Sequence, residues 1–183
     1  MKTLSTSPKV LLTAIAIVAI FSVPSFASNH DITNNEKTVY EMPDTGRVLP
    51  NNPLFIFKQI REEIELLLAT GEEKARLLVQ LSDRYTSYGA KMVKLNKPQV
   101  AFQSFEESIS YQNEFVKLIA ENQKQEDLKT DEEICFRSIQ SNIKQAEILR
   151  ASITDISDSD QPAIASLLEK NLDTRAKIEK CGK

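Results

Sequence analysis

Histidine, glycine and cysteine are scarce in this chain of 183 residues, which contains one histidine, four glycines and two cysteines. Catalytic triads and cysteine–histidine pairs need a histidine that is held in place. His30 is the only one, and it lies in a polar N-terminal stretch where little preorganisation is expected. The chain has no glycine-rich phosphate loop, and carboxylates such as Glu62 and Glu65 are typical of the solvated face of a helix. The sequence therefore predicts a protein that is not an enzyme.

A basic surplus is also missing. Lys2 and Lys9 are the only charged residues among the first 27, and without them 21 basic residues stand against 26 acidic ones, a net charge of −5. Proteins that bind nucleic acid or anionic membranes present a basic stripe. The charge balance therefore argues against nucleic acid and against an anionic membrane as partners.

No apolar run is long enough to span a bilayer. The longest, residues 10–21, follows Lys2 and Lys9 and falls short of the roughly 20 residues of a membrane-spanning helix. The small-x-small sequence of residues 25–27 then matches a signal-peptide cleavage site, and no cysteine for a lipid anchor lies nearby. We therefore expect residues 1–27 to be a cleaved signal peptide, with export to the periplasm or the outside and no membrane span afterwards.

The mature chain is predicted to consist of a disordered leader and one helical domain. Residues 28–47 are rich in Asn, Asp and Thr and show no helical or strand period, although the pair Val39-Tyr40 is expected to pack on the body. In residues 48–183 apolar residues recur at three- and four-residue steps. This pattern predicts an all-α fold, a compact bundle of about five helices joined as antiparallel hairpins. The helices are expected at residues 53–70, 72–95, 99–125, 130–154 and 162–180.

The first of these helices carries the densest apolar surface of the domain. Asn52 and Pro53 are favourable at a helix start, and Gly71 can supply the left-handed residue that ends the helix. We expect this helix to lie at the centre of the bundle. Its apolar stripe is predicted to contain Leu54, Phe57, Ile60, Ile64, Leu67 and Leu68, and Phe55, Ile56 and Leu66 widen the stripe beyond what one packing face needs.

The same region resembles a known family. The matching residues are Leu49-Pro50, Pro53-Leu54-Phe55, Phe57-Lys58, Glu62, Glu73-Lys74-Ala75 and Arg84. They resemble the opening of a small exported bacterial domain of unknown function, which typically reads Leu-Pro-x-Ser-Pro-Leu-Tyr-x-Leu-Lys. Asn52 replaces the usual Ser, Phe55 replaces the usual Tyr, and Ser87 stands where an acidic residue is common. The resemblance covers residues 48–94 and implies no activity, because none is assigned to the family.

The hairpin of the second and third helices is weakly similar to a tetratricopeptide unit. Gly89, Ala101 and Phe105 match the spacing of that repeat's small and aromatic positions, but no second copy follows at a period near 34 residues. Glycine inside a helix costs about 1 kcal/mol relative to alanine, so Gly89 predicts the close approach of another helix. A groove for an extracytoplasmic protein partner is one interpretation of this hairpin, and plain core packing is the other. Both concern Tyr85, Tyr88, Phe102 and Phe105.

Cys135 and Cys181 are predicted to form a disulfide. They lie at equal sequence distances from Asp158, the centre of the turn between the last two helices, so an antiparallel hairpin brings them level. An even pair of cysteines in an exported chain is typical of a structural disulfide. Two free thiols, or half of a metal site, are the alternatives.

One metal site is also predicted, on the condition that cleavage follows Ala27. The mature chain would then begin Ser28-Asn29-His30, and the amine, two amides and the imidazole form the square-planar set that Cu(II) and Ni(II) prefer. A histidine placed there by chance is the alternative.

Taken as a whole, the sequence predicts an exported, non-catalytic helical module for protein interaction or structure. An extracytoplasmic protein that binds a small ligand or Cu/Ni is the second possibility.

Overall fold

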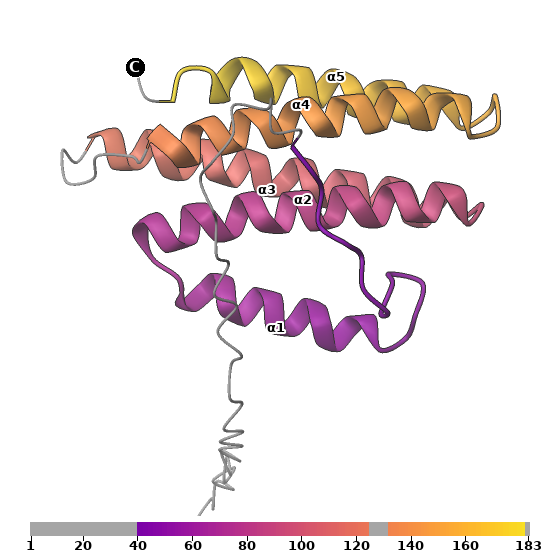
Figure 1. Cartoon of the computed structure of the whole chain (residues 1–183), viewed down its shortest axis with the longest axis horizontal. Helices are drawn as coiled ribbons and strands as arrows, with labels where there is room; N and C mark the ends of the chain where they lie inside the picture. Colours follow the sequence, from indigo (N-terminus) through magenta and orange to yellow (C-terminus); the bar gives the residue numbers. More distant parts are fainter. Residues whose placement is uncertain (1–39, 125–131, 182–183) are drawn as a thin grey trace, which may run out of the picture. The chain divides into compact units, whose positions relative to one another are not determined.

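The computed structural model describes residues 40–124 and 132–181, all of which belong to one compact unit, Thr38–Lys183. These residues form helices and connecting segments, with no strand among them. Figure 1 shows the five helices, which are α1 (Phe55–Leu68), α2 (Gly71–Lys94), α3 (Pro98–Lys124), α4 (Glu132–Thr154) and α5 (Gln161–Ile178). The all-α prediction is confirmed, and the predicted bounds of α2 and α5 differ from the observed ones by one or two residues. The helix start predicted at Thr130 lies outside the described residues.

Four of the helices form a bundle. α2 packs against α3 and α4, and α5 packs against the same two helices, so that α2–α3 and α4–α5 are neighbouring hairpins. α1 contacts α2 and lies at the outer edge (Figure 1). The predicted central position of α1 is therefore wrong.

A Schellman motif reverses the chain between α2 and α3. Asn96 takes the left-handed conformation, with φ of 53°, and its N–H donates to Val93 O at 2.9 Å. The N–H of Lys97 donates to Met92 O at 2.9 Å, which satisfies a second free carbonyl of the last turn. Pro98 then begins α3, where the lack of an N–H is harmless. This short link makes the two helices antiparallel.

The bundle interior has two apolar ends and a polar middle. One cluster at the α2–α3 link contains Met92, Phe105, Leu149 and Ile164, and the cluster at the opposite end contains Leu78, Phe115, Ile134 and Ile178. Between them, side chains from all four helices form a buried hydrogen-bonded layer: Gln145 donates to Ser108 Oγ at 2.6 Å, Asn171 donates to Gln145 Oε1 at 2.6 Å, and the Ser82 and Ser108 hydroxyls lie 3.0 Å apart. Polar groups that must meet one another favour a single register of the helices.

Gly89 lies at a close contact between α2 and α3. A Cβ atom at this position would lie 2.5 Å from Cε1 of Phe105, whose ring is fully buried. The close approach predicted from this glycine is confirmed.

The described part of the predicted leader, residues 40–47, is anchored to the bundle. The Tyr40 hydroxyl donates to Asp83 of α2 at 2.5 Å, and Ser141 of α4 donates to the other oxygen of the same carboxylate at 2.6 Å. From this anchor the chain runs to the N-terminus of α1 (Figure 1). Tyr40 therefore packs on the body, as expected for the Val39-Tyr40 pair, because its hydroxyl satisfies a buried carboxylate 43 positions further along the sequence.

Candidate interaction surface

The predicted aromatic groove between α2 and α3 is filled by its own side chains. Tyr85, Tyr88 and Phe105 are buried, and Phe102 is partly buried against the cluster at the α2–α3 link. Burial raises the pKa of Tyr88 to about 12, as expected of a phenol removed from water. The burial of these residues agrees with the core interpretation, and the predicted groove between α2 and α3 is filled, although Tyr85 also lines the cleft beside α1 described below.

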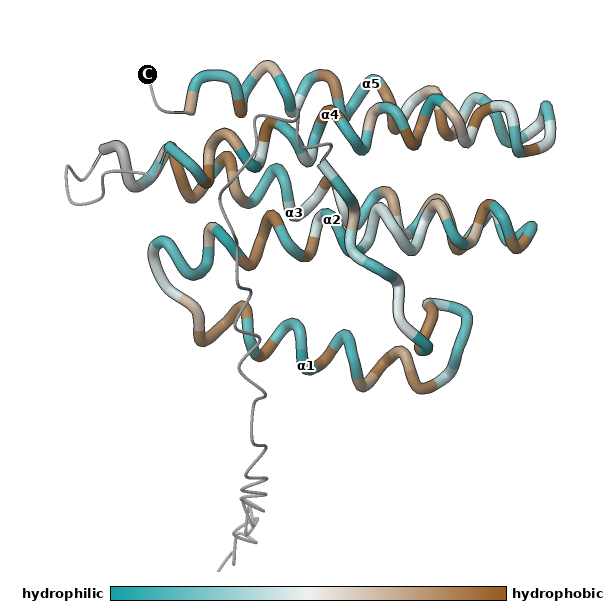
Figure 2. Tube along the Cα trace, in the orientation of Figure 1, coloured by the Kyte–Doolittle hydropathy of each residue, from teal (hydrophilic) through white to brown (hydrophobic). Residues whose placement is uncertain are grey.

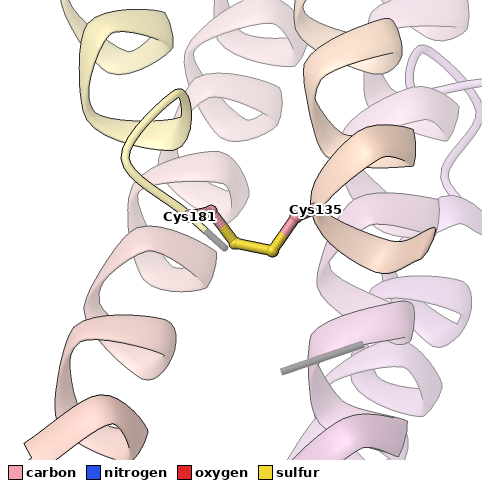
Figure 3. The surroundings of a disulfide bond; sticks show 2 residues. All are labelled: Cys135 and Cys181. Atoms are coloured by element: carbon pink, nitrogen blue, oxygen red, sulfur yellow. A yellow bond between two sulfur atoms is a disulfide. The ribbon is translucent and has the colours of Figure 1, made fainter. Parts of the chain in front are cut away.

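Cys135 and Cys181 form a disulfide, as predicted. Their Cα atoms are 5.8 Å apart, with Cys135 in the first turn of α4 and Cys181 just past α5 (Figure 3). Cys135 is buried beside the apolar cluster of Ile134 and Ile178, so the bond closes the open end of the α4–α5 hairpin. Its position indicates a structural role.

The predicted Cu(II) or Ni(II) site at the mature N-terminus stays a prediction. Ser28, Asn29 and His30 lie outside the described residues. Within residues 40–124 and 132–181, no group of three or more His, Cys, Asp or Glu side chains could hold a metal ion.

A cleft of about 410 Å³ opens between the start of α1 and α3, and sequence reasoning missed it. Its walls include Phe55, Gln59, Tyr85, Gln103 and Glu107. Burial raises the pKa of Glu107 above its ordinary value, and nearby glutamates add to the effect. The cleft is open to solvent and acidic along its α3 side.

The largest unexplained feature of the described chain is the outward side of α1. Seven large apolar side chains point away from the bundle, with exposed fractions from 46% for Ile60 to 82% for Leu67. We call this set the outer face of α1: Leu54, Ile56, Phe57, Ile60, Ile64, Leu67 and Leu68. Figure 2 shows that apolar residues recur along the whole length of this helix. Together they expose on the order of 800 Å², which is more than the largest apolar patch of a typical monomer, about 300–600 Å².

The inward side of α1 combines polar anchors with Phe55 and Leu66, so most of the predicted apolar stripe is turned outward. Glu62 is only 2% exposed, accepts a hydrogen bond from Arg84 Nη1 at 2.6 Å, and accepts a second from the Tyr85 hydroxyl at 3.1 Å. Phe55 packs edge-on against Tyr88, with ring centroids 5.3 Å apart. These partners fix the rotation of α1. Of the nine residues of the predicted stripe, Phe55 and Leu66 pack inward as expected, and the other seven are exposed.

Lys58 adds a second polar anchor on the same side. Its ammonium donates to the Tyr88 hydroxyl and lies 4.7 Å from the centre of that ring. Burial lowers the pKa of Lys58 below its ordinary value. Because both long charged side chains of the inward face reach α2, rotation of the helix would break two sets of contacts.

The outer face continues into a hollow at the C-terminal end of α1. This hollow has a volume of about 750 Å³, and its walls include Leu68, Ala69, Leu77 and Gln80. A partner that covers the outer face would therefore meet a concave rim at this end.

None of the described helices is long and apolar enough to cross a membrane. Comparisons with known protein families, curated proteins and solved structures find no match for the chain. The resemblance of residues 48–94 to the exported domain of unknown function, and the weaker one of the α2–α3 hairpin to a tetratricopeptide unit, stay predictions.

Proposed function

We propose that the protein is an exported, non-catalytic helical module, periplasmic or secreted, that binds another protein through the outer face of α1. One observation carries this proposal: seven large apolar side chains are exposed on a helix whose buried side holds a carboxylate. Exposed apolar patches of this size are typical of interaction sites. The disulfide is compatible with the oxidising environment outside the cytoplasm.

The rigidity of α1 supports the proposal. The helix is anchored by Glu62, Lys58 and Phe55, so its outer face has a defined shape before a partner arrives. Preorganised apolar surfaces lose less side-chain and backbone freedom on binding than flexible segments do. The contacts with the bundle therefore both hold α1 in place and turn its outer face towards solvent.

Photo-cross-linking in the native envelope tests this function. A photoreactive residue at Ile64 is expected to yield protein adducts, and one at Leu172, a partly exposed apolar residue on α5, serves as the matched control. Adducts from Ile64 that disappear when Leu67 is replaced by Glu would support the proposal. No adduct from Ile64, or equal adducts from both sites, would refute it.

Small-ligand binding in the cleft beside α3 is the second candidate function. Its volume of about 410 Å³ falls in the range of small-molecule sites, and Gln59, Gln103 and Glu107 present hydrogen-bonding groups to it. An acidic wall favours a ligand that carries amine or hydroxyl donors. Titration with a panel of small amines and polyols, followed by nuclear magnetic resonance, is expected to shift the side-chain amides of Gln59 and Gln103. Unchanged amides throughout the panel would exclude this candidate.

A further inference from the structure

We infer that the partner of α1 is α1 of a second copy of this chain, packed antiparallel across a two-fold axis. This inference rests on the proposed function, because it names the occupant of the same outer face. Four features support it: the order of residues on that face, the charges beside it, its area, and the small number of other segments that could cover it.

Six of the seven residues of the outer face are placed symmetrically about Glu62, and Leu54 has no apolar counterpart. Ile60 and Ile64 lie two residues before and after it, Phe57 and Leu67 five residues, and Ile56 and Leu68 six residues. Glu62 itself points into the bundle, so the midpoint of the face lies on the opposite side of the helix at the same height. An antiparallel two-fold pair with its axis at the level of Glu62 brings each residue opposite the residue of the other copy that lies equally far on the other side of Glu62.

The spacing along the face suits helix pairing. Phe57, Ile60, Ile64 and Leu67 follow at steps of three, four and three residues, which is the a and d pattern of a coiled-coil seam. In the antiparallel pair, Phe57 of one copy lies level with Leu67 of the other, and Ile60 lies level with Ile64. All four layers are then filled by one large apolar residue from each copy.

The charges beside the seam are compatible with this pairing. On one flank Arg61 donates to Glu65 at 2.7 Å within the helix, which leaves that flank neutral. On the other flank the exposed Glu63 approaches its own symmetry mate near the two-fold axis. Two like charges at close range oppose association, so Glu63 is expected to weaken the pair without preventing it.

The area fits a dimer. One copy offers on the order of 800 Å² of apolar surface, which is about what each partner contributes to a standard protein–protein interface. The face lies on the edge helix, and no other described helix packs on its outward side (Figure 1). Two copies can therefore approach with their bundles on opposite sides of the seam.

The other segments and surfaces fit less well. Residues 28–39 contain only two large aliphatic side chains, Ile32 and Val39, too few to cover seven exposed ones. A helix that lies on an anionic membrane is rich in Lys and Arg beside its apolar face. Glu63 lies on one flank of α1, and Arg61 on the other flank is neutralised by Glu65. A second copy, which brings an apolar face of the same length, is the better match.

Sedimentation over a wide concentration range tests the pairing on the mature, disulfide-bonded chain. We expect a reversible monomer–dimer equilibrium. Ile60→Glu and Leu67→Glu should shift the dissociation constant at least tenfold towards monomer, whereas Leu172→Glu should leave it unchanged and Glu63→Gln should tighten it several-fold. Far-ultraviolet circular dichroism checks that each variant is folded.

Cysteine cross-linking tests the direction, because Phe57 and its own symmetry mate would be separated by about 15 Å along an antiparallel seam. Mixed Phe57→Cys and Leu67→Cys proteins should form a disulfide-linked heterodimer, and neither protein should cross-link efficiently with itself. Self-linked Phe57→Cys dimers would overturn the antiparallel arrangement.

A protein that stays monomeric at every concentration, or a dimer insensitive to Ile60→Glu, would overturn the pairing altogether. The same set of experiments distinguishes failure of the self-association from failure of the proposed function. A monomer whose Ile64 still yields adducts with a different protein would refute self-association and leave the proposed function standing. A monomer with no such adducts would refute both.

Discussion

Replacement of Gly89 by alanine tests the close approach of α2 and α3. The added Cβ would lie 2.5 Å from Cε1, 2.6 Å from Cδ1 and 2.7 Å from Cζ of the Phe105 ring. Ordinary carbon contacts are about 3.5–4.0 Å, so the ring or the helix must move by roughly 1 Å. The ring is fully buried in one cluster with Met92, Ile109 and Leu149, so its displacement would disturb the packing of the core.

Two opposing contributions set the size of the effect. Overpacking of a core costs about 1–3 kcal/mol, whereas alanine is favoured over glycine within a helix by about 1 kcal/mol. We therefore expect Gly89→Ala to lower the free energy of unfolding by up to about 2 kcal/mol. Urea titration followed by circular dichroism, with the disulfide intact, measures this change.

A double-mutant cycle assigns the loss to the ring. Phe105→Leu removes the ring edge that Cβ would meet, so Gly89→Ala should cost less in the Phe105→Leu background than in the wild type. A Gly89→Ala protein that is more stable than the wild type would refute the reasoning. Equal costs in both backgrounds would refute the assignment to Phe105.

Three further predictions concern the disulfide, the buried ion pair and pH. Replacement of Cys135 and Cys181 by serine should lower the free energy of unfolding by about 4 kcal/mol, the loop-closure contribution, and reductant should then have no further effect in a urea titration. Arg84→Met should lower the free energy of unfolding by about 2–3 kcal/mol, because the buried Glu62 loses its cationic partner. The loss is limited because Arg84 is partly exposed. In the same assay, the double variant with Glu62→Gln should recover part of the lost stability. Burial raises the pKa of Asp83, so its contribution to stability is largest below its ordinary pKa and falls as the pH rises through the raised value; Asp83→Asn should flatten this part of the curve of unfolding free energy against pH.

The bundle could be predicted from the sequence because its signals are local. The stripes of α2 to α5 repeat at helical spacing, and the turn near Asp158 lies midway between the two cysteines. Gly89 predicted a close helix contact for the same reason, because glycine is unfavourable inside a helix unless close packing there requires it. These features depend on spacing along the chain, which the sequence displays directly.

The polar middle of the bundle could not be predicted in this way. Gln145 and Asn171 belong to different helices, and their hydrogen bond joins side chains 26 positions apart. A buried amide and a solvated amide are identical in sequence, and only the partner distinguishes them. Packing of Tyr40 on the body was expected, but its partner Asp83 could not be predicted, because a lone tyrosine in a polar stretch carries no periodic signal.

The orientation of α1 shows where a pattern of hydrophobic residues is insufficient. Periodicity identifies which side of a helix is apolar, but it does not say whether that side meets its own chain or another molecule. Here Glu62 and Lys58 find Arg84, Tyr85 and Tyr88 on α2, and these contacts hold the helix with its apolar side outward.

The same contacts explain why the exposed face persists in a folded domain. A half-turn rotation of α1 would bury the apolar stripe, yet it would carry Glu62 into water, strand Arg84 beside the bundle and pull Phe55 out of its contact with Tyr88. A helix held in this way keeps its apolar side available, at the cost of apolar surface left in water. That cost is recovered only when another apolar surface covers the face. The order of apolar residues is nearly the same in both directions from Glu62, so an antiparallel second copy offers a surface that matches it.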